Sequence, residues 1–266
     1  MLQPAAMVHQ TAVVRRHVTE RRLPPRRVWG MLALRSAVSF ALLLAVALAY
    51  ALLGRADPIA ASSAWWLWFV TVANFASIAL MARFARLEGL RLRDVYFFDR
   101  TTWRGDLKWA GIFAVGSVLL AMPPGMALAA LLWGNANTPN DLLFQPLPLL
   151  AVYPLLLLMP VTQALAELPI YWGYVAPRLR AFGYGRWTVI GLVGAVLSLQ
   201  HLFFSFQLDW LFGLWLAVLF LPFALWTGYV ADRRPTALPY LMALHFLIDA
   251  SLPVLLLLVS RGMSIG

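Results

Sequence analysis

The sequence predicts an all-α membrane protein, a polytopic transmembrane helical bundle of about seven spans. Of its 266 residues, 62% are hydrophobic and only 12% are charged, and the mean hydropathy is +0.77. Soluble domains are about 25% charged. The apolar residues fall in seven runs, each long enough for the ~20 residues of helix that cross a hydrocarbon core. We therefore expect a basic N-terminal arm at residues 1–30 and a single transmembrane domain at residues 31–266.

Each apolar run predicts one membrane span. The predicted spans are Met31–Leu53, Ala64–Ala82, Trp109–Trp133, Leu147–Tyr174, Trp187–Phe206, Trp210–Val230 and Leu238–Val259. The fourth span contains several prolines, and Pro169 lies two residues after Glu167. Proline frees backbone carbonyls, which are tolerated at membrane depth against protein or a wet cavity. We therefore expect this span to be broken, and either a cavity or an ordinary kink would explain the break.

Lysine and arginine residues predict the orientation. They gather in the arm and in the second, fourth and sixth gaps between spans, whereas the first gap holds only Arg55 and the third and fifth hold none. This alternation predicts a multi-pass protein of the cell membrane with a cytoplasmic N-terminus and an outside C-terminus. The same distribution accounts for the net charge of +10, so we do not expect nucleic acid to be a partner. The run after the arm is too long for a signal-peptide core, so we interpret it as a retained anchor.

The second gap, Arg83–Lys108, mixes basic residues with the aromatic stretch Val95-Tyr96-Phe97-Phe98. Such a mixture is typical of an interfacial helix lying on the cytoplasmic leaflet. A solvated loop explains it equally well.

Four ionisable residues inside the runs indicate chemistry: Glu167, His201, His245 and Asp249. Arg35 is set aside because it lies near the start of the first run. A charge at the bilayer centre costs at least ~2.5–3.5 kcal/mol, so spans keep one mainly where it functions. Two carboxyls and two imidazoles on three spans can activate water, which points to intramembrane hydrolysis. The competing explanation is a hydrogen bond between helices for Glu167 and for His201, and a structural hydrogen bond within one helix for His245 and Asp249. The absence of cysteine excludes thiolate chemistry.

Three motifs then resemble those of the CAAX prenyl protease and bacteriocin-processing (CPBP, or Abi) family. Ala166-Glu-Leu-Pro-Ile-Tyr-Trp-Gly-Tyr174, followed by Pro177-Arg178-Leu179, resembles its first motif, EExxxRGY with a PRL-like exit. Leu197-Ser-Leu-Gln-His201 resembles the second, FxxxH, and His245-Phe-Leu-Ile-Asp249 the third, HxxxN/D. The resemblance covers a protease-like core at about residues 147–259.

This resemblance implies an intramembrane endopeptidase. Glu167 and His201 would activate the water, while His245 with Asp249 would hold the oxyanion, Asp249 orienting the ring. The chain departs from the first motif at Leu168, where a second glutamate is usual, and at Trp172, where arginine is usual; Leu197 replaces the phenylalanine of the second. A catalytically impaired member acting as a scaffold or immunity-type protein is therefore an alternative. A small transporter is a further one, because buried acids and histidines relay protons.

The same residues are compatible with either a metalloprotease or a glutamate-type protease. In a metalloprotease, Glu167, His201 and His245 would bind zinc, since two histidines and a carboxylate with an open position match a catalytic zinc site. The expected partners are membrane lipids and a peptide or protein substrate, a prenylated one included.

Overall fold

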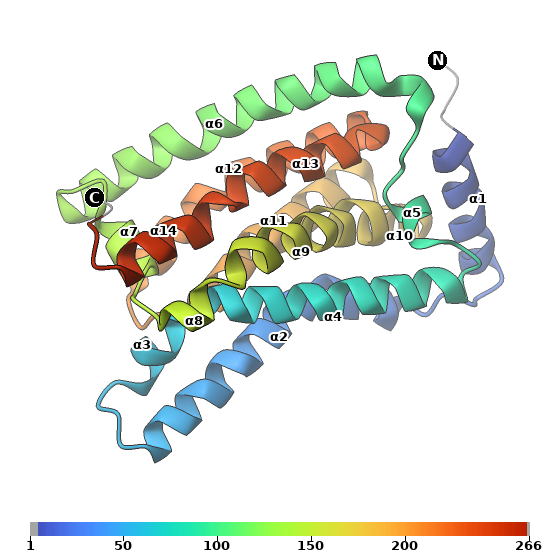
Figure 1. Cartoon of the computed structure of the whole chain (residues 1–266). Coiled ribbons are helices and arrows are strands. Elements are labelled where there is room, and N and C mark those ends of the chain that lie inside the picture. Colours follow the sequence, from blue (N-terminus) through green and yellow to red (C-terminus); the bar gives the residue numbers. More distant parts are fainter. Residues whose placement is uncertain (1–4, 265–266) are drawn as a thin grey trace.

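The computed structural model describes residues 5–264, and within that range it contains helices joined by turns and loops, with no strands (Figure 1). Seven of its helical segments are long and apolar enough to cross a membrane, which confirms the predicted polytopic bundle. In chain order the elements are α1 (Ala5–Thr19), α2 (Pro25–Leu52), α3 (Pro58–Ser63), α4 (Trp66–Leu87), α5 (Leu92–Val95), η1 (Arg100–Thr102), α6 (Trp103–Trp133), α7 (Thr138–Leu143), α8 (Leu149–Val152), α9 (Leu155–Leu168), η2 (Pro169–Val175), α10 (Ala176–Ala181), α11 (Arg186–Phe204), α12 (Trp210–Arg233), η3 (Pro235–Ala237), α13 (Leu238–Asp249) and α14 (Ser251–Ser260).

Local signals set several helix ends. Pro25 begins α2, where its missing N–H costs nothing because the first turn has no acceptor for it. Asp209 precedes α12 and accepts hydrogen bonds from the backbone N–H groups of Leu211 and Phe212. The helix α6 stops at Gly134, whose φ of 73° is left-handed and suits glycine.

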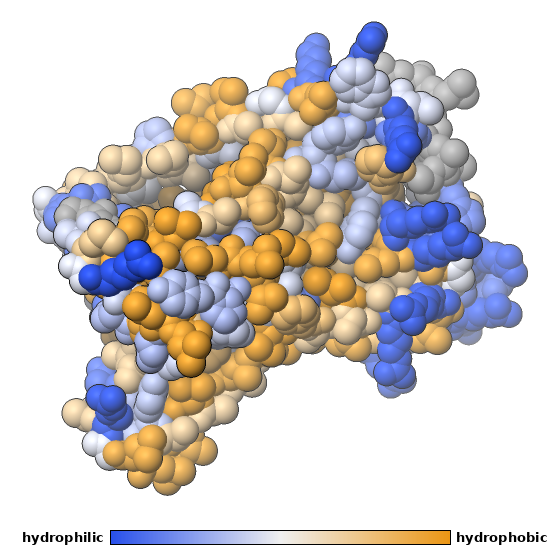
Figure 2. Space-filling model, in the orientation of Figure 1, coloured by the Kyte–Doolittle hydropathy of each residue, from blue (hydrophilic) through white to orange (hydrophobic). Residues whose placement is uncertain are grey.

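The helix α9 lies at the centre of the bundle and packs against α4 on one side and α13 on the other. The helix α2 contacts both α4 and α11, α11 packs along α12, and α12 packs against the outlying α6 (Figure 1). The elements α1, α5 and α10 gather at one end, and α14 finishes at the other. Strongly hydrophilic side chains concentrate at the end with α1, while apolar surface follows the helices away from it (Figure 2). We call the end formed by α1, α5 and α10 the basic end.

The fourth span is not broken at Pro169 but changes there from α-helix to π-helix; its break lies at Tyr153–Pro154, between α8 and α9. The segment η2 is a π-helix of seven residues that begins at this proline, directly after α9. π-Helical segments are rare and often lie at functional sites. Pro177, four residues after Gly173, has no N–H to donate to the Gly173 carbonyl. The side chain of Gln10 in α1 donates to that carbonyl instead, at 2.9 Å, so the N-terminal helix is bound to η2.

Two segments at the basic end have side chains buried in the bundle. The arm contains α1, in which Gln10 is fully buried and Val14 only 1% exposed. Within the Arg83–Lys108 gap, α4 continues to Leu87, the short elements α5 and η1 follow, and α6 begins at Trp103. Val95 and Phe97 are buried, so the part of the gap around α5 packs against the core of the bundle.

A buried ion pair holds α10 to the end of α4. Arg178 donates from Nε to Glu88 Oε2 at 3.1 Å, and both side chains are almost completely enclosed. The Tyr174 hydroxyl donates to Glu88 Oε1 at 3.0 Å. These contacts fix the exit of η2 and therefore the position of the helix that precedes it.

Candidate functional site

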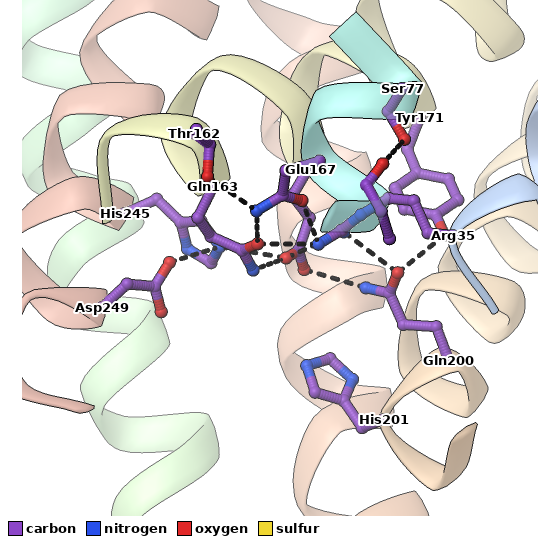
Figure 3. A network of polar contacts seen from close by, with 12 residues as sticks. Arg35, Ser77, Thr162, Gln163, Glu167, Tyr171, Gln200, His201, His245 and Asp249 are labelled. Atoms are coloured by element: carbon purple, nitrogen blue, oxygen red, sulfur yellow. Dashed lines mark hydrogen bonds and ion pairs between the residues drawn. The ribbon is translucent and has the colours of Figure 1, made fainter. Parts of the chain in front are cut away.

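A cluster of polar side chains fills the middle of the bundle, between α2, α4, α9, α11 and α13 (Figure 3). Glu167, near the end of α9, is at its centre and is 1% exposed. His245 and Asp249 of α13 are each 6% exposed. The surrounding helices therefore shield these ionisable groups almost completely.

The structure brings three of the four predicted residues together. His245 Nε2 lies 3.6 Å from Glu167 Oε2 and 3.2 Å from Asp249 Oδ2. His245 and Asp249 are one helical turn apart, so they share the face of α13 that meets α9. The imidazole thus lies between two carboxyl groups from different helices.

Arg35 is the fourth member of the cluster, and setting it aside as a residue near the start of a span was wrong. The helix α2 begins at Pro25, six residues before the predicted Met31, so Arg35 lies ten residues into the helix, or ~15 Å at 1.5 Å per residue. Its side chain is fully buried, and its Nη1 lies 2.9 Å from Glu167 Oε2. Arg35 is the only Lys or Arg inside the seven predicted runs, which is the signal that could have identified it.

Neutral amides surround this ion pair. Arg35 donates to the side-chain oxygens of Gln163 at 2.7 Å, Asn74 at 2.9 Å and Gln200 at 3.0 Å. Gln200 Nε2 in turn donates to Glu167 Oε1 at 2.9 Å, and Gln163 Nε2 donates to Glu167 Oε2. Both oxygens of the carboxylate therefore accept hydrogen bonds, and the amides link the ion pair to α4 and α11.

His201 stands apart from this group. Its Nδ1 lies 3.0 Å from the Ser198 carbonyl of its own helix, and its ring stacks on Phe220 with 3.6 Å between centroids. Among residues 5–264 no hydrogen bond or ion pair joins it to Glu167, His245 or Asp249, and Figure 3 shows it off to one side. The preceding residue, Gln200, is the one that α11 turns toward Glu167.

The side of the cluster around His245 has unused hydrogen-bonding capacity. Both ring nitrogens of His245 and Oδ2 of Asp249 are buried, with no hydrogen-bond partner in the described part of the chain. The 3.2 Å approach of these two residues is therefore an electrostatic contact without hydrogen-bond geometry. Buried polar atoms nearly always have partners, so such a group marks a place for water or a polar ligand atom.

The three ligands considered for zinc, Glu167, His201 and His245, are not gathered around one point in the described part of the chain. Over residues 5–264, no three histidine or acidic side chains are arranged to hold a metal ion. The Arg35 guanidinium occupies the position beside Glu167 where a cation would bind, and His201 points elsewhere. Zinc also needs ligands at about 2.0–2.2 Å around one point.

Leu168 and Trp172, the two departures from the first motif, are both apolar and both buried in the same core. They are one turn apart on the chain, where the family pattern has an acid and a base. The Trp172 ring lies against α12 at Gly228, where even a Cβ would collide with it. An apolar pair of suitable shape is often as stable as a buried ion pair. The two departures thus place core side chains where the family pattern has charged ones.

Comparison with protein-family models, curated proteins and solved structures finds no match.

Proposed function

We propose that this protein is an intramembrane endopeptidase of the kind that the CPBP-like motifs imply. The observation that supports it best is the group of Glu167, His245 and Asp249 around a buried arginine, in a membrane interior that otherwise excludes charge. Holding such groups together without water is costly, and function is the usual reason for it.

The geometry favours a revised division of roles. A water molecule hydrogen-bonded between Glu167 Oε2 and His245 Nε2 would lose a proton to this pair and attack the scissile carbonyl carbon. The C–N bond would then break as the same pair returns a proton to the leaving amine. Asp249, whose Oδ2 lies 3.2 Å from the same nitrogen, would stabilise the positive charge that His245 gains with the proton, and Arg35 would hold the Glu167 carboxylate in position. His245 thereby takes the place beside Glu167 that the motif alone gave to His201.

A second candidate is a catalytically impaired scaffold, and one observation favours it. Both oxygens of Glu167 are already engaged by Arg35, Gln163 and Gln200. A carboxylate in that state is a well-satisfied structural group. Under this alternative the cluster would hold the helices in register and perform no chemistry.

Glu167→Gln separates the two candidates. We expect this change to abolish proteolysis, since the amide keeps the shape of the side chain and loses the base; general-base catalysis contributes about 10²–10⁴-fold. Comparative proteomics of membranes containing equal amounts of wild type or variant would show the substrate as peptides that accumulate only with the variant. Glu20→Gln is the matched control, because Glu20 is a surface residue paired with Arg16.

The two histidines give a sharper test of the geometry. His245→Ala should match Glu167→Gln, whereas His201→Ala should retain most of the activity, because its ring does not reach the carboxylate. Peptide profiles that are identical for wild type and Glu167→Gln in every condition of expression would favour the scaffold. Equal loss in both histidine variants would return His201 to the site.

A further inference from the structure

A cleft of about 640 Å³ opens at the basic end, separate from the polar cluster. Its walls come from α1, α10, α11 and α12, and the Trp172 ring and Phe97 form part of its apolar lining. Val189 and Ile190 of α11 extend that lining and are buried. Its volume is in the range of ordinary small-molecule sites, which are mostly apolar with a few convergent polar groups.

The polar groups of the cleft are mainly cationic. Arg15 of α1, Arg180 of α10 and Arg186 of α11 line it, and Asp232 of α12 is its one acidic residue. Arg186 Nε lies 2.7 Å from Asp232 Oδ2. Its Nη2 is buried and has no hydrogen-bond acceptor among residues 5–264. The cleft therefore has an excess of positive charge and an unused guanidinium donor.

Exposed aromatic residues place this cleft at the level of lipid headgroups. Trp187, next to Arg186, is 65% exposed, and Tyr184 and Trp29 are exposed and pack edge to face with ring centroids 6.2 Å apart. Trp and Tyr gather where a membrane meets water, because one end of the ring is apolar and the other is wet. Arginine also suits phosphate, which its planar fork can bind through two hydrogen bonds.

We propose that this cleft binds the phosphate headgroup of an anionic membrane lipid. Arg186 and Arg180 would contact the phosphate, and the apolar lining would accept the glycerol and the first carbons of the acyl chains. Basic pockets between transmembrane helices bind anionic lipids in this way. The proposal is independent of the proteolytic function, since none of the three arginines belongs to the Glu167 cluster.

The test titrates purified full-length protein in neutral detergent with phosphatidylglycerol or phosphatidylcholine and follows bound lipid by native mass spectrometry. Phosphatidylglycerol should bind at least about tenfold more tightly, because both lipids have the phosphate but the choline cation of phosphatidylcholine cancels its net charge and is repelled by the arginines of the cleft. The double variant Arg180→Gln/Arg186→Gln should lose this preference. Arg83→Gln, which removes an exposed arginine of another element, should keep it.

A second variant distinguishes a loss of lipid binding from a loss of the fold in the double variant. Ala181→Trp would fill the cleft from its α10 wall while leaving every charge in place, and it should also abolish the preference. Equal binding of both lipids by wild type, or an equal loss in Arg83→Gln, would overturn the proposal. Displacement of phosphatidylglycerol by millimolar inorganic phosphate would overturn the lipid as the source and assign the cleft to a soluble phosphate compound.

Discussion

Arg35 and Glu167 form a buried ion pair that joins the first span to the fourth. Neither charge is stable alone in this position, since removing one partner of a buried pair typically costs about 3–5 kcal/mol. The surrounding amides add hydrogen bonds to both sides of the pair. The ion pair therefore contributes to the stability of the bundle as well as to its proposed chemistry.

Arg35→Gln is expected to destabilise the protein by about 3–5 kcal/mol, because it leaves the Glu167 carboxylate buried without its cation. Thermal unfolding of the purified variant in detergent measures this as a lower midpoint. Arg55→Gln is the control, since Arg55 is exposed on the loop after α2. The double variant Arg35→Gln/Glu167→Gln should lose less stability than the sum of the two single changes. A midpoint equal to that of wild type in Arg35→Gln would contradict the ion pair.

The residues of the site were predictable from the rarity of charge in the spans, but their contacts were not. A helix turns by ~100° per residue, so the choice between Gln200 and His201 as the neighbour of Glu167 depends on the rotation of α11. That rotation is set by packing against α12 and α2, which the motif does not encode. Arg35 was missed for a related reason, because the first span starts earlier than its apolar run.

Packing around the π-helical segment depends on a large residue meeting a small one. Trp172 of η2 lies against Gly228 of α12, and a Cβ at that glycine would overlap the indole ring. The sequence pattern located the irregular part of this span at Pro169, since proline has a known local effect, although it predicted a break where the structure has a π-helix. It could not locate the partner on α12, which lies more than fifty residues away in the chain.

Gly228→Ala should destabilise the protein by about 1–3 kcal/mol, the typical cost of overpacking a core. Gly191→Ala is its matched control, because Gly191 is also helical and a Cβ there would meet nothing within 4 Å. The control should be neutral or stabilising by up to about 1 kcal/mol from helix propensity. Unfolding midpoints of both variants give the comparison. A Gly228→Ala variant as stable as Gly191→Ala would show that Trp172 does not pack as described.

At the scale of the whole bundle, residues 5–264 contain an odd number of helical segments long enough to cross a membrane, so α1 and the end of α14 lie at opposite ends (Figure 1). The sequence predicted this architecture well, because the length and apolarity of a span are local properties. The docking of α1 was not predicted. Its buried residues Gln10 and Val14 are too few to form a recognisable pattern in a basic arm.

We propose that the basic end faces the cytoplasm, as the distribution of arginine predicts. The chain contains no cysteine, so single-cysteine variants test this without background labelling. Asn137→Cys, in the exposed loop between α6 and α7, should react with an impermeant maleimide in intact cells. Arg93→Cys, on the exposed surface of α5, should react only after permeabilisation. The reverse pattern would invert the topology.

The pairing of Arg35 with α9 has a consequence for how the protein is made. Gln163, its hydrogen-bond partner on α9, is synthesised 128 residues after Arg35, and Glu167 follows it. At about 5–20 residues per second, the nascent first span waits roughly 6–26 seconds for its counter-charge. An unpaired guanidinium is unfavourable in hydrocarbon for all of that time. The first span is therefore expected to stay beside the insertion machinery and to enter the lipid together with the fourth.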